Sequence, residues 1–133
     1  MTVQTLHRIT VSGASGRMGQ RLIEAVRAAD HCQLSGALDH GASAAIGQDA
    51  MAFLGQTSGV QITGDLHAGL KGAHALIDFT RPEGTLAHLA VCRELGVNAI
   101  IGTTGFTPQQ KAEIGAFARD MAIVMAPNMS VGV

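Results

Sequence analysis

Residues 8–19 run R-I-T-V-S-G-A-S-G-R-M-G, a short apolar strand that enters a glycine-rich turn. The three glycines of the turn, Gly13, Gly16 and Gly19, recur every three residues. A helix is predicted directly after the strand, over residues 17–29, because apolar residues recur there at helical spacing. The apolar stripe of this helix is predicted to consist of Met18, Leu22, Val26 and Ala29.

A second apolar strand is predicted at residues 33–38, and Asp39 follows it directly. Strand, glycine turn, helix and strand in this order form a βαβ unit. Such a unit, with an acidic residue about twenty positions beyond the last glycine, is the context in which a glycine pattern indicates a dinucleotide site.

The rest of the chain alternates short apolar strands with helices. Strands are predicted at residues 75–78, 98–101 and 122–125, and helices at 66–70, 80–95 and 107–121. Thr80 with Glu83 predicts a capping box, and Thr107 followed by Pro108 predicts a second capped helix start. Residues 41–64 are predicted to form a long excursion with one helical turn near Met51.

This alternation predicts an α/β fold, a Rossmann-like doubly wound parallel sheet with helices on both faces. No repeat or linker divides the sequence, so residues 1–133 are predicted to form one dinucleotide-binding domain. The sequence stops at Val133 soon after a strand, which suggests that a second half is missing.

The composition limits the partners that the chain can have. Hydrophobic residues make up 47% and charged residues 14%, and the formal net charge is −1. We expect no nucleic-acid partner, because no basic patch is present, and no membrane partner, because no apolar stretch is long enough. No metal site is expected, and Cys32 and Cys92 are predicted to be reduced. Without a signal peptide, the predicted location is cytoplasmic.

The glycine turn suits a pyrophosphate. Free N–H groups at a helix start, together with the helix dipole, favour negative charge. Glycine is required where the backbone turns sharply and where it touches phosphate. The spacing departs from the usual G-x-G-x-x-G, and the alternative is a tight turn that binds no ligand. We expect this turn to hold the pyrophosphate of NADH or NADPH.

Asp39 is expected to accept hydrogen bonds from the hydroxyls of the adenosine ribose, unless it is only a solvated loop carboxylate. His40 beside it could face a 2′-phosphate, and Arg17 is the better cation for that phosphate or the pyrophosphate. Because a carboxylate repels a 2′-phosphate, NADH is predicted to bind about as well as NADPH or better.

Ligands of open α/β sheets bind outside the carboxyl ends of the strands. Three segments leave predicted strands there, namely residues 79–81, 102–106 and 126–130, and each could instead be a simple capped turn. The candidate cofactor-binding residues are Gly13, Ala14, Ser15, Gly16, Arg17, Met18, Asp39, His40, Phe79, Thr80, Arg81, Gly102, Thr103, Thr104, Ala126, Pro127, Asn128 and Met129.

Four motifs together resemble one family, 4-hydroxy-tetrahydrodipicolinate reductase, also called dihydrodipicolinate reductase. They are V-S-G-A-S-G-R-M-G (11–19), I-D-F-T-R-P-E-G-T (77–85), G-T-T-G-F (102–106) and A-P-N-M-S-V-G-V (126–133). The resemblance implies an NAD(P)H-dependent oxidoreductase of the diaminopimelate route to lysine, a cytoplasmic homotetramer at full length. It places residues 13–18 on the pyrophosphate, Asp39 on the adenosine ribose, and residues 102–104 and 126–129 on the nicotinamide side.

The chain departs from the family in several places. Glu-Arg is common where this chain has Asp39-His40, Phe is frequent at the position of Met129, and Ala14-Ser15 replaces a more glycine-rich turn. The family's C-terminal domain, which holds the dicarboxylate substrate and most of the tetramer interface, is absent from residues 1–133. No catalytic residue is therefore assigned, and these residues alone are expected to bind cofactor without turnover.

Other functions use the same glycine turn. The cofactor half of another dehydrogenase, acting on homoserine or aspartate semialdehyde, is the nearest alternative among enzymes. A non-catalytic nucleotide-binding module, redox-sensing or CoA-binding, would need neither the Thr103 and Thr104 hydroxyls nor the Asn128 amide. A scaffold that binds nothing would use the glycines only to turn.

Overall fold

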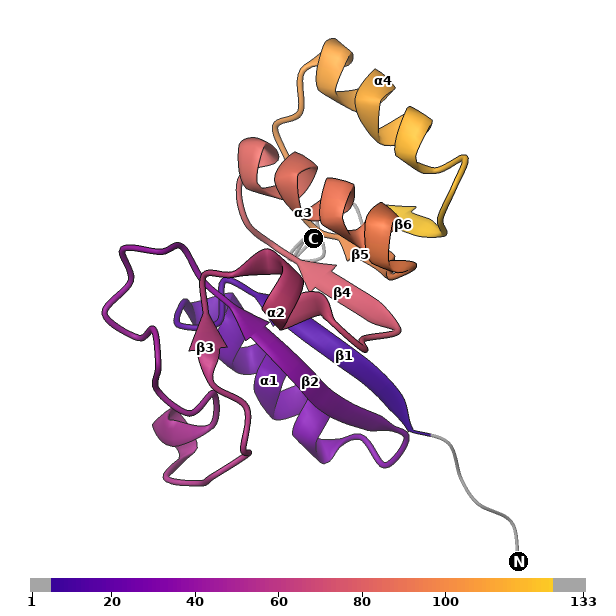
Figure 1. The fold of residues 1–133 in the computed structure, drawn as a ribbon. Coiled ribbons are helices and arrows are strands. Elements are labelled where there is room, and N and C mark those ends of the chain that lie inside the picture. Colours follow the sequence, from indigo (N-terminus) through magenta and orange to yellow (C-terminus); the bar gives the residue numbers. More distant parts are fainter. Residues whose placement is uncertain (1–5, 126–133) are drawn as a thin grey trace, which may run out of the picture.

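The computed structural model describes residues 6–125. Its centre is a six-stranded, all-parallel sheet with the order β3-β2-β1-β4-β5-β6 (Figure 1). The strands are β1 (His7–Ser12), β2 (Cys32–Leu38), β3 (Ile62–Thr63), β4 (Ala75–Asp78), β5 (Asn98–Ile101) and β6 (Ile123–Met125). The helices are α1 (Arg17–Ala28), α2 (Leu66–Leu70), α3 (Pro82–Leu95), α4 (Pro108–Phe117) and the 3₁₀ helix η1 (Ala52–Leu54).

Helices lie on both faces of this sheet. Buried hydrophobic side chains pack α1 against one face, and α2, α3 and α4 against the other (Figure 1). The order of the strands reverses between β1 and β4, which defines a doubly wound sheet. The prediction of a Rossmann-like fold is confirmed.

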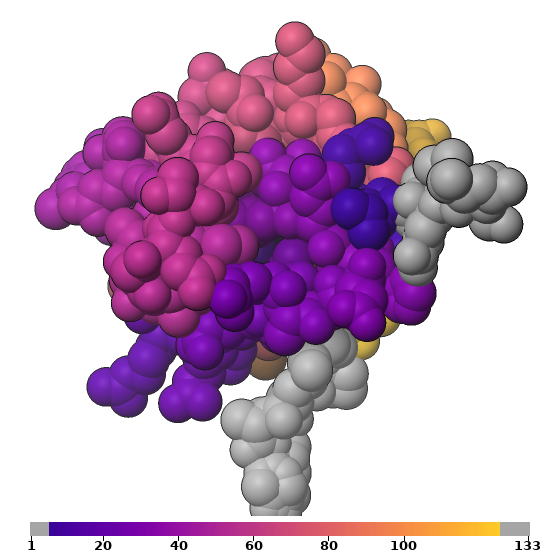
Figure 2. Space-filling view, turned by 90° about the horizontal axis from the view of Figure 1, so that it is seen from below, coloured from indigo at the N-terminus to yellow at the C-terminus, as the bar shows by residue number. Residues whose placement is uncertain are grey.

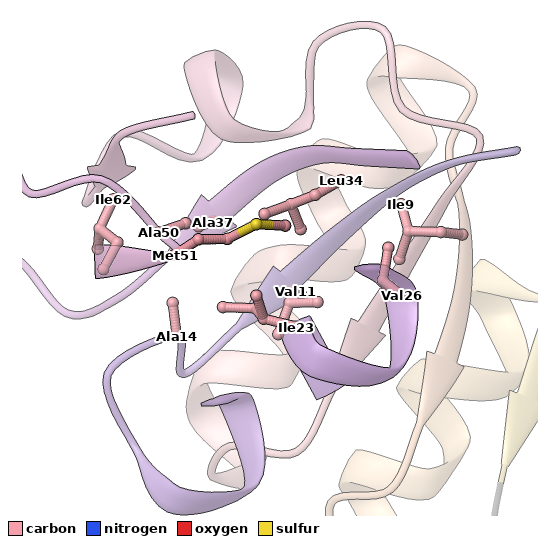
Figure 3. Packing of buried hydrophobic residues seen from close by; sticks show 10 residues of the cluster. All are labelled: Ile9, Val11, Ala14, Ile23, Val26, Leu34, Ala37, Ala50, Met51 and Ile62. Carbon is pink, nitrogen blue, oxygen red and sulfur yellow. The ribbon is translucent and has the colours of Figure 1, made fainter. Parts of the chain in front are cut away.

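The α1 face is held by an aliphatic cluster. Figure 3 shows Ile23 and Val26 of α1 turned toward Val11 and Ile9 of β1. Both Ile23 and Val11 are fully buried. Burying an aliphatic side chain of this size contributes about 1.5–3 kcal/mol, so these contacts fix α1 against the sheet.

The predicted stripe of α1 is wrong in part. The buried positions are Gly19, Ile23 and Val26, whereas Met18 is 42% exposed. The helix presses its Gly19 backbone onto the preceding turn, so a residue without a side chain lies on its buried face. A search for apolar side chains at helical spacing does not detect such a position.

The opposite face buries Cys92 of α3 completely. Burial, with a smaller contribution from the charge of Asp78, raises the pKa of this thiol to about 12. Cys32 is only half-buried, and both cysteines are free, as predicted.

The two thiols are therefore expected to differ in reactivity. At pH 8 iodoacetamide should alkylate Cys32 while Cys92 stays unmodified, because the reactive thiolate is absent from a buried thiol of such high pKa. Peptide mass spectrometry of the folded and the urea-unfolded chain measures this. Alkylation of both residues at one rate in the folded chain would contradict it.

On the face of the sheet that α1 packs against, the strand residues are buried to different extents. Val11, Ile77, Ile100 and Val124 form one row across β1, β4, β5 and β6. Val11 at one end is 0% exposed and Val124 at the other end is 58% exposed, while Ile77 and Ile100 between them are half-buried. Among the described residues, the helix of this face packs mainly on β1 and β2, and Ile77 of β4 contacts the same cluster.

The excursion between β2 and β3 occupies one side of the molecule, away from α4 and β6 (Figure 2). Its single helical turn near Met51 was predicted, and η1 confirms it. Strand β3 was missed, because a strand of two residues shows no alternating pattern.

Asp49 organises this excursion. Its carboxylate accepts hydrogen bonds from the backbone N–H groups of Met51, Ser58 and Gly59, and from the Ser58 hydroxyl. The backbone bonds of Met51 and Ser58 are the largest influences, and the pKa of Asp49 falls to about 2.

An Asp49→Asn variant is expected to lose stability at neutral pH, because an amide cannot accept all of these bonds. A depressed folded-state pKa stabilises the folded chain above the unfolded value of 3.8, and this is lost as the pH falls through about 2. The difference in free energy of unfolding between wild type and variant should thus be constant from pH 7 to 5 and shrink toward pH 2. Urea titrations at each pH measure it, and a difference that grows on acidification would contradict it.

Candidate functional site

A crevice of about 1020 Å³ opens at the carboxyl ends of β1, β2 and β4, where the strand order reverses. This is the place where open α/β sheets bind ligands. Of the predicted residues, those that line it are Gly13, Ser15, Gly16, Arg17, Met18, Asp39, His40, Phe79, Thr80 and Arg81. The crevice thus brings together the predicted residues of the glycine turn other than Ala14, both residues that follow β2, and the segment 79–81.

The glycine turn leaves backbone N–H groups at the start of α1 without hydrogen-bond acceptors. Gly13 has a φ of +71°, a left-handed conformation that favours glycine, and its carbonyl accepts from the N–H of Gly16 at 2.9 Å. The first hydrogen bond of α1 runs from the N–H of Gln20 to the carbonyl of Gly16 at 2.9 Å. The N–H groups of residues 17–19 therefore have no acceptor within the helix. No side chain caps the helix at Gly16, so these donors can serve a ligand.

Close packing fixes this turn. A Cβ atom on Gly19 would lie 2.0 Å from the carbonyl oxygen of Gly13. Only glycine allows α1 to approach β1 so closely.

Asp39 lies at one end of the crevice, and several donors already bind it. One carboxylate oxygen accepts from the N–H of His40 at 2.9 Å. The other accepts from the N–H and hydroxyl of Ser15 and from the Ser43 hydroxyl. Partial burial raises the pKa of Asp39, but these hydrogen bonds outweigh it and hold the pKa below its usual value. The carboxylate is therefore ionised at neutral pH, and its Oδ1, which accepts only from the N–H of His40, can accept a further bond from a ribose hydroxyl.

Three of the predicted residues besides Asp39 bring a cationic or ionisable side chain to the crevice. Arg17, His40 and Arg81 line it, and all three are exposed. Arg17 is the first residue of α1, beside the open amides, which is the position expected for a phosphate contact.

A buried carboxylate lies beneath the crevice, at the end of β4. Asp78 is completely buried, and one oxygen accepts from the hydroxyls of Ser12 at 2.8 Å and Thr80 at 2.6 Å. The other oxygen lies 2.9 Å from Nδ1 of His88. Burial raises the pKa of Asp78, but the hydrogen bond and charge of His88, with the two hydroxyls, outweigh it and hold the pKa below its usual value. This network fixes the floor of the crevice.

The predicted capping box at Thr80 is wrong. The N-cap of α3 is Arg81, Pro82 begins the helix, and no side chain caps it. The Thr80 hydroxyl donates instead to Asp78, a buried acceptor that would otherwise lack a partner. The box at Thr107, by contrast, forms with Gln110, and Pro108 stands at the first helical position, as predicted.

The second predicted segment supports the crevice without lining it. A Cβ atom on Gly102 would lie 1.9 Å from the ring of Phe79, so Gly102 makes room for that ring. Thr103 is 6% exposed, and its hydroxyl oxygen accepts from the N–H of Thr80 at 2.9 Å. Thr104 is exposed and is not among the residues that line the crevice.

Two further groups of predicted residues lie elsewhere. Ala14 is buried, and its N–H donates to the carbonyl of Leu38 at 2.9 Å. Ala126, Pro127, Asn128 and Met129 lie outside the described residues.

Sequence reasoning missed several residues of the crevice. They are Ser12, Leu38, Gly41, Gly64, Leu66, Glu83, Gly84 and His88. A signal for two of them exists: Gly84 and His88 are four residues apart, and hence on one face of α3. A carboxylate at the end of the apolar strand β4 also demands a buried partner, which His88 supplies.

Within residues 6–125, no group of three His, Cys, Asp or Glu side chains could hold a metal ion. No helix of that same part is long and apolar enough to cross a membrane.

Comparisons with known proteins agree on one family. The family model described as dihydrodipicolinate reductase, N-terminus, matches residues 7–129. A 4-hydroxy-tetrahydrodipicolinate reductase of Cupriavidus pinatubonensis is 59% identical over 125 residues, covering 94% of this chain and 47% of that protein. One from Herminiimonas arsenicoxydans is 60% identical over 126 residues, covering 95% of this chain and 47% of the relative. The chain spans about half the length of the curated relatives it matches.

Solved structures agree on the fold. The dipicolinate-bound dihydrodipicolinate reductase of Paenisporosarcina sp. TG-14 superposes with a TM-score of 0.75 at 24% identity, over 96% of this chain and 49% of that one. A WlbA dehydrogenase of Chromobacterium violaceum, in complex with NADH and UDP-GlcNAcA, gives a TM-score of 0.72 at 17% identity, over 95% of this chain and 36% of that one.

Proposed function

Because the chain belongs to the dihydrodipicolinate reductase family, whose N-terminus matches residues 7–129, we propose that its crevice binds NADH or NADPH. The observation that carries the proposal is the set of open N–H groups of residues 17–19, at a crevice that Asp39 also lines. Amides at a helix start bind a pyrophosphate, and a carboxylate beyond the next strand binds a ribose diol.

The residues of the crevice have separate roles in this proposal. The amides of α1 and the Arg17 guanidinium hold the pyrophosphate. Asp39 orients the adenosine ribose, and His40 borders it. Phe79, Thr80 and Arg81 border the nicotinamide half, and Gly102 and Thr103 keep Phe79 and Thr80 in place. Thr104 and residues 126–129 are proposed to contact the nicotinamide itself.

The activity of the full-length protein is proposed from its relatives, which are named 4-hydroxy-tetrahydrodipicolinate reductases. When bound, NADH or NADPH would supply a hydride for the reduction of 4-hydroxy-tetrahydrodipicolinate to tetrahydrodipicolinate, in which the substrate hydroxyl leaves with a proton as water, in the cytoplasmic route to diaminopimelate and lysine. The dicarboxylate substrate, the catalytic residues and the homotetramer interface are assigned to a further domain. Residues 1–133 are proposed to bind cofactor without turnover.

The test is titration of the chain with NADH, followed by nicotinamide fluorescence. The absence of Trp and Tyr removes the usual protein background. Fluorescence should rise with saturation, and ADP should compete. Binding of CoA or of adenine nucleotides without any response to the nicotinamide would favour a sensor or CoA-binding module instead, and no binding at all would contradict the proposal.

A matched pair of variants tests whether NADH binding depends on the glycine turn. Gly13 and Gly72 both have positive φ, +71° and +80°, so alanine strains the backbone similarly at each. Only Gly13 lines the crevice. Gly13→Ala should weaken NADH binding, whereas Gly72→Ala should not.

A further inference from the structure

A second hollow lies between α3 and α4, away from the cofactor crevice. The two helices pack side by side (Figure 1), and a groove of about 330 Å³ lies between them. Its lining residues are Leu86, Arg93, Glu113, Ala116 and Phe117, and none of them lines the crevice. Ligand sites in proteins begin at about 300 Å³, so the groove has room for a small ligand only.

The floor of the groove is apolar and rests on the core. Leu86 of α3 and Phe117 of α4 are half-buried, and both pack against a buried cluster that includes Leu89 and Ile114. Because protein cores are closely packed, this floor is held in one arrangement. It offers a fixed apolar surface to whatever enters the groove.

A guanidinium lies over this floor with its donors unused. The Cζ atom of Arg93 is 4.6 Å from the centroid of the Phe117 ring, which is within reach of a cation–π interaction. Within residues 6–125, none of the N–H groups of the Arg93 side chain donates a hydrogen bond. The ring therefore positions the cation while its N–H groups stay available. A guanidinium fork matches a carboxylate, which can accept two of them.

The opposite charge lines the same groove. Glu113 lies one helical turn before Phe117 on α4, and hence on the same side of that helix. Arg93 and Glu113 nevertheless form no ion pair within the described part of the chain, so their charged atoms are more than 4.0 Å apart. A phosphate would be repelled by Glu113 and a simple cation by Arg93. A ligand that carries both charges, one at each end of a short spacer, satisfies both side chains.

We propose that this groove binds a free α-amino acid with an apolar side chain. The carboxylate of the ligand accepts hydrogen bonds from the Arg93 guanidinium, and its ammonium group donates to the Glu113 carboxylate. Its side chain lies on the apolar surface of Leu86, Ala116 and Phe117. The inference does not depend on the proposed cofactor function, because the two sites share no lining residue.

The test is an NMR titration of the ¹⁵N-labelled chain with three ligands. L-leucine should shift the backbone amide signals of Arg93, Glu113 and Phe117 to saturation, with a millimolar Kd, and leave the signals of the glycine turn in place. Leucinamide lacks the carboxylate charge, and N-acetyl-leucine lacks the ammonium charge. Each should bind about fivefold more weakly than leucine, which corresponds to about 1 kcal/mol, the value for an exposed ion pair of good geometry.

Two variants assign each charge of the ligand to its partner. In Arg93→Gln, leucine and leucinamide should bind within about twofold of each other, because the partner of the carboxylate is gone, while N-acetylation still weakens binding. In Glu113→Gln, leucine and N-acetyl-leucine should become equal instead. Lys111→Gln and Asp120→Asn are the matched controls: they remove the same charges from exposed positions outside the groove and should keep the wild-type order of the three ligands.

Two results would overturn the inference. Equal affinities of the three ligands for wild type would show that only apolar contact holds them. The absence of any saturable shift at α3 and α4, up to the solubility limit of leucine, would show that the groove takes no amino acid. All four substituted side chains are exposed, so the variants are expected to fold, and the spectra themselves report whether they do.

Discussion

A single added methyl group at Gly19 is expected to abolish cofactor binding and to destabilise the chain. In Gly19→Ala the new Cβ atom would lie 2.0 Å from the carbonyl oxygen of Gly13 and 2.7 Å from its carbonyl carbon. Both are backbone atoms, so the start of α1 must move away from β1. Overpacking of this kind costs about 1–3 kcal/mol, and a clash with backbone belongs at the upper end.

The displacement of α1 also misaligns its open amides. Losing two hydrogen bonds to a charged phosphate, each worth about 1.5–3 kcal/mol, should raise the Kd for NADH at least about 100-fold. Urea unfolding and fluorescence titration of the same preparation measure the two effects.

Gly115→Ala is the control for this substitution. Gly115 lies in α4, is exposed, and a Cβ atom there would meet nothing within 4 Å. Alanine should stabilise this helix by about 0.5–1 kcal/mol and leave NADH binding unchanged. If Gly19→Ala behaved like Gly115→Ala, the close approach of α1 to β1 would have no role in the site.

The second large effect is expected at Asp39, on the choice between NADH and NADPH. The ionised carboxylate should repel a 2′-phosphate, so wild type should bind NADPH no more tightly than NADH. Two charges 4 Å apart repel by about 1 kcal/mol in water and about 4 kcal/mol at an effective dielectric constant of 20. In Asp39→Asn the ratio of the two Kd values should therefore shift toward NADPH by at least about tenfold, the equivalent of 1.4 kcal/mol.

The same variant should bind NADH more weakly, because the amide cannot accept as many bonds from Ser15, His40 and the ribose. Asp120→Asn removes the same charge from an exposed position after α4 and should change neither affinity. Titrations with both cofactors at one ionic strength are required, since salt screens exposed charges. Wild type that bound NADPH more than tenfold tighter than NADH would refute the expected role of Asp39.

The sequence was sufficient for the fold class and for the order of every element except β3, because short apolar strands and helices alternate in it outside residues 41–64. The prediction of the family was confirmed by the match over residues 7–129. The glycine turn and Asp39, which the sequence predicts to bind one cofactor, both line one crevice, since both follow strands whose carboxyl ends share one edge.

Other features depend on tertiary contacts that no local pattern contains. Gly19 takes a buried position on α1 through backbone contact, which displaces the predicted apolar stripe. The Thr80 hydroxyl binds Asp78 rather than capping α3, because the buried carboxylate requires donors. His88 could be recognised only after β4 and α3 were placed against each other, which brings its ring to that carboxylate.

The row from Val11 to Val124 indicates that local stability differs from strand to strand in the sheet. Within residues 6–125, strands β1 and β2 are packed between helices on both faces, whereas the apolar cluster on β5 and β6 lies on one face. Free energies of local opening follow the density of buried apolar contacts around a segment. The stability of the sheet is therefore expected to differ along it. Local unfolding should begin at β6, and the βαβ unit that frames the crevice should unfold last.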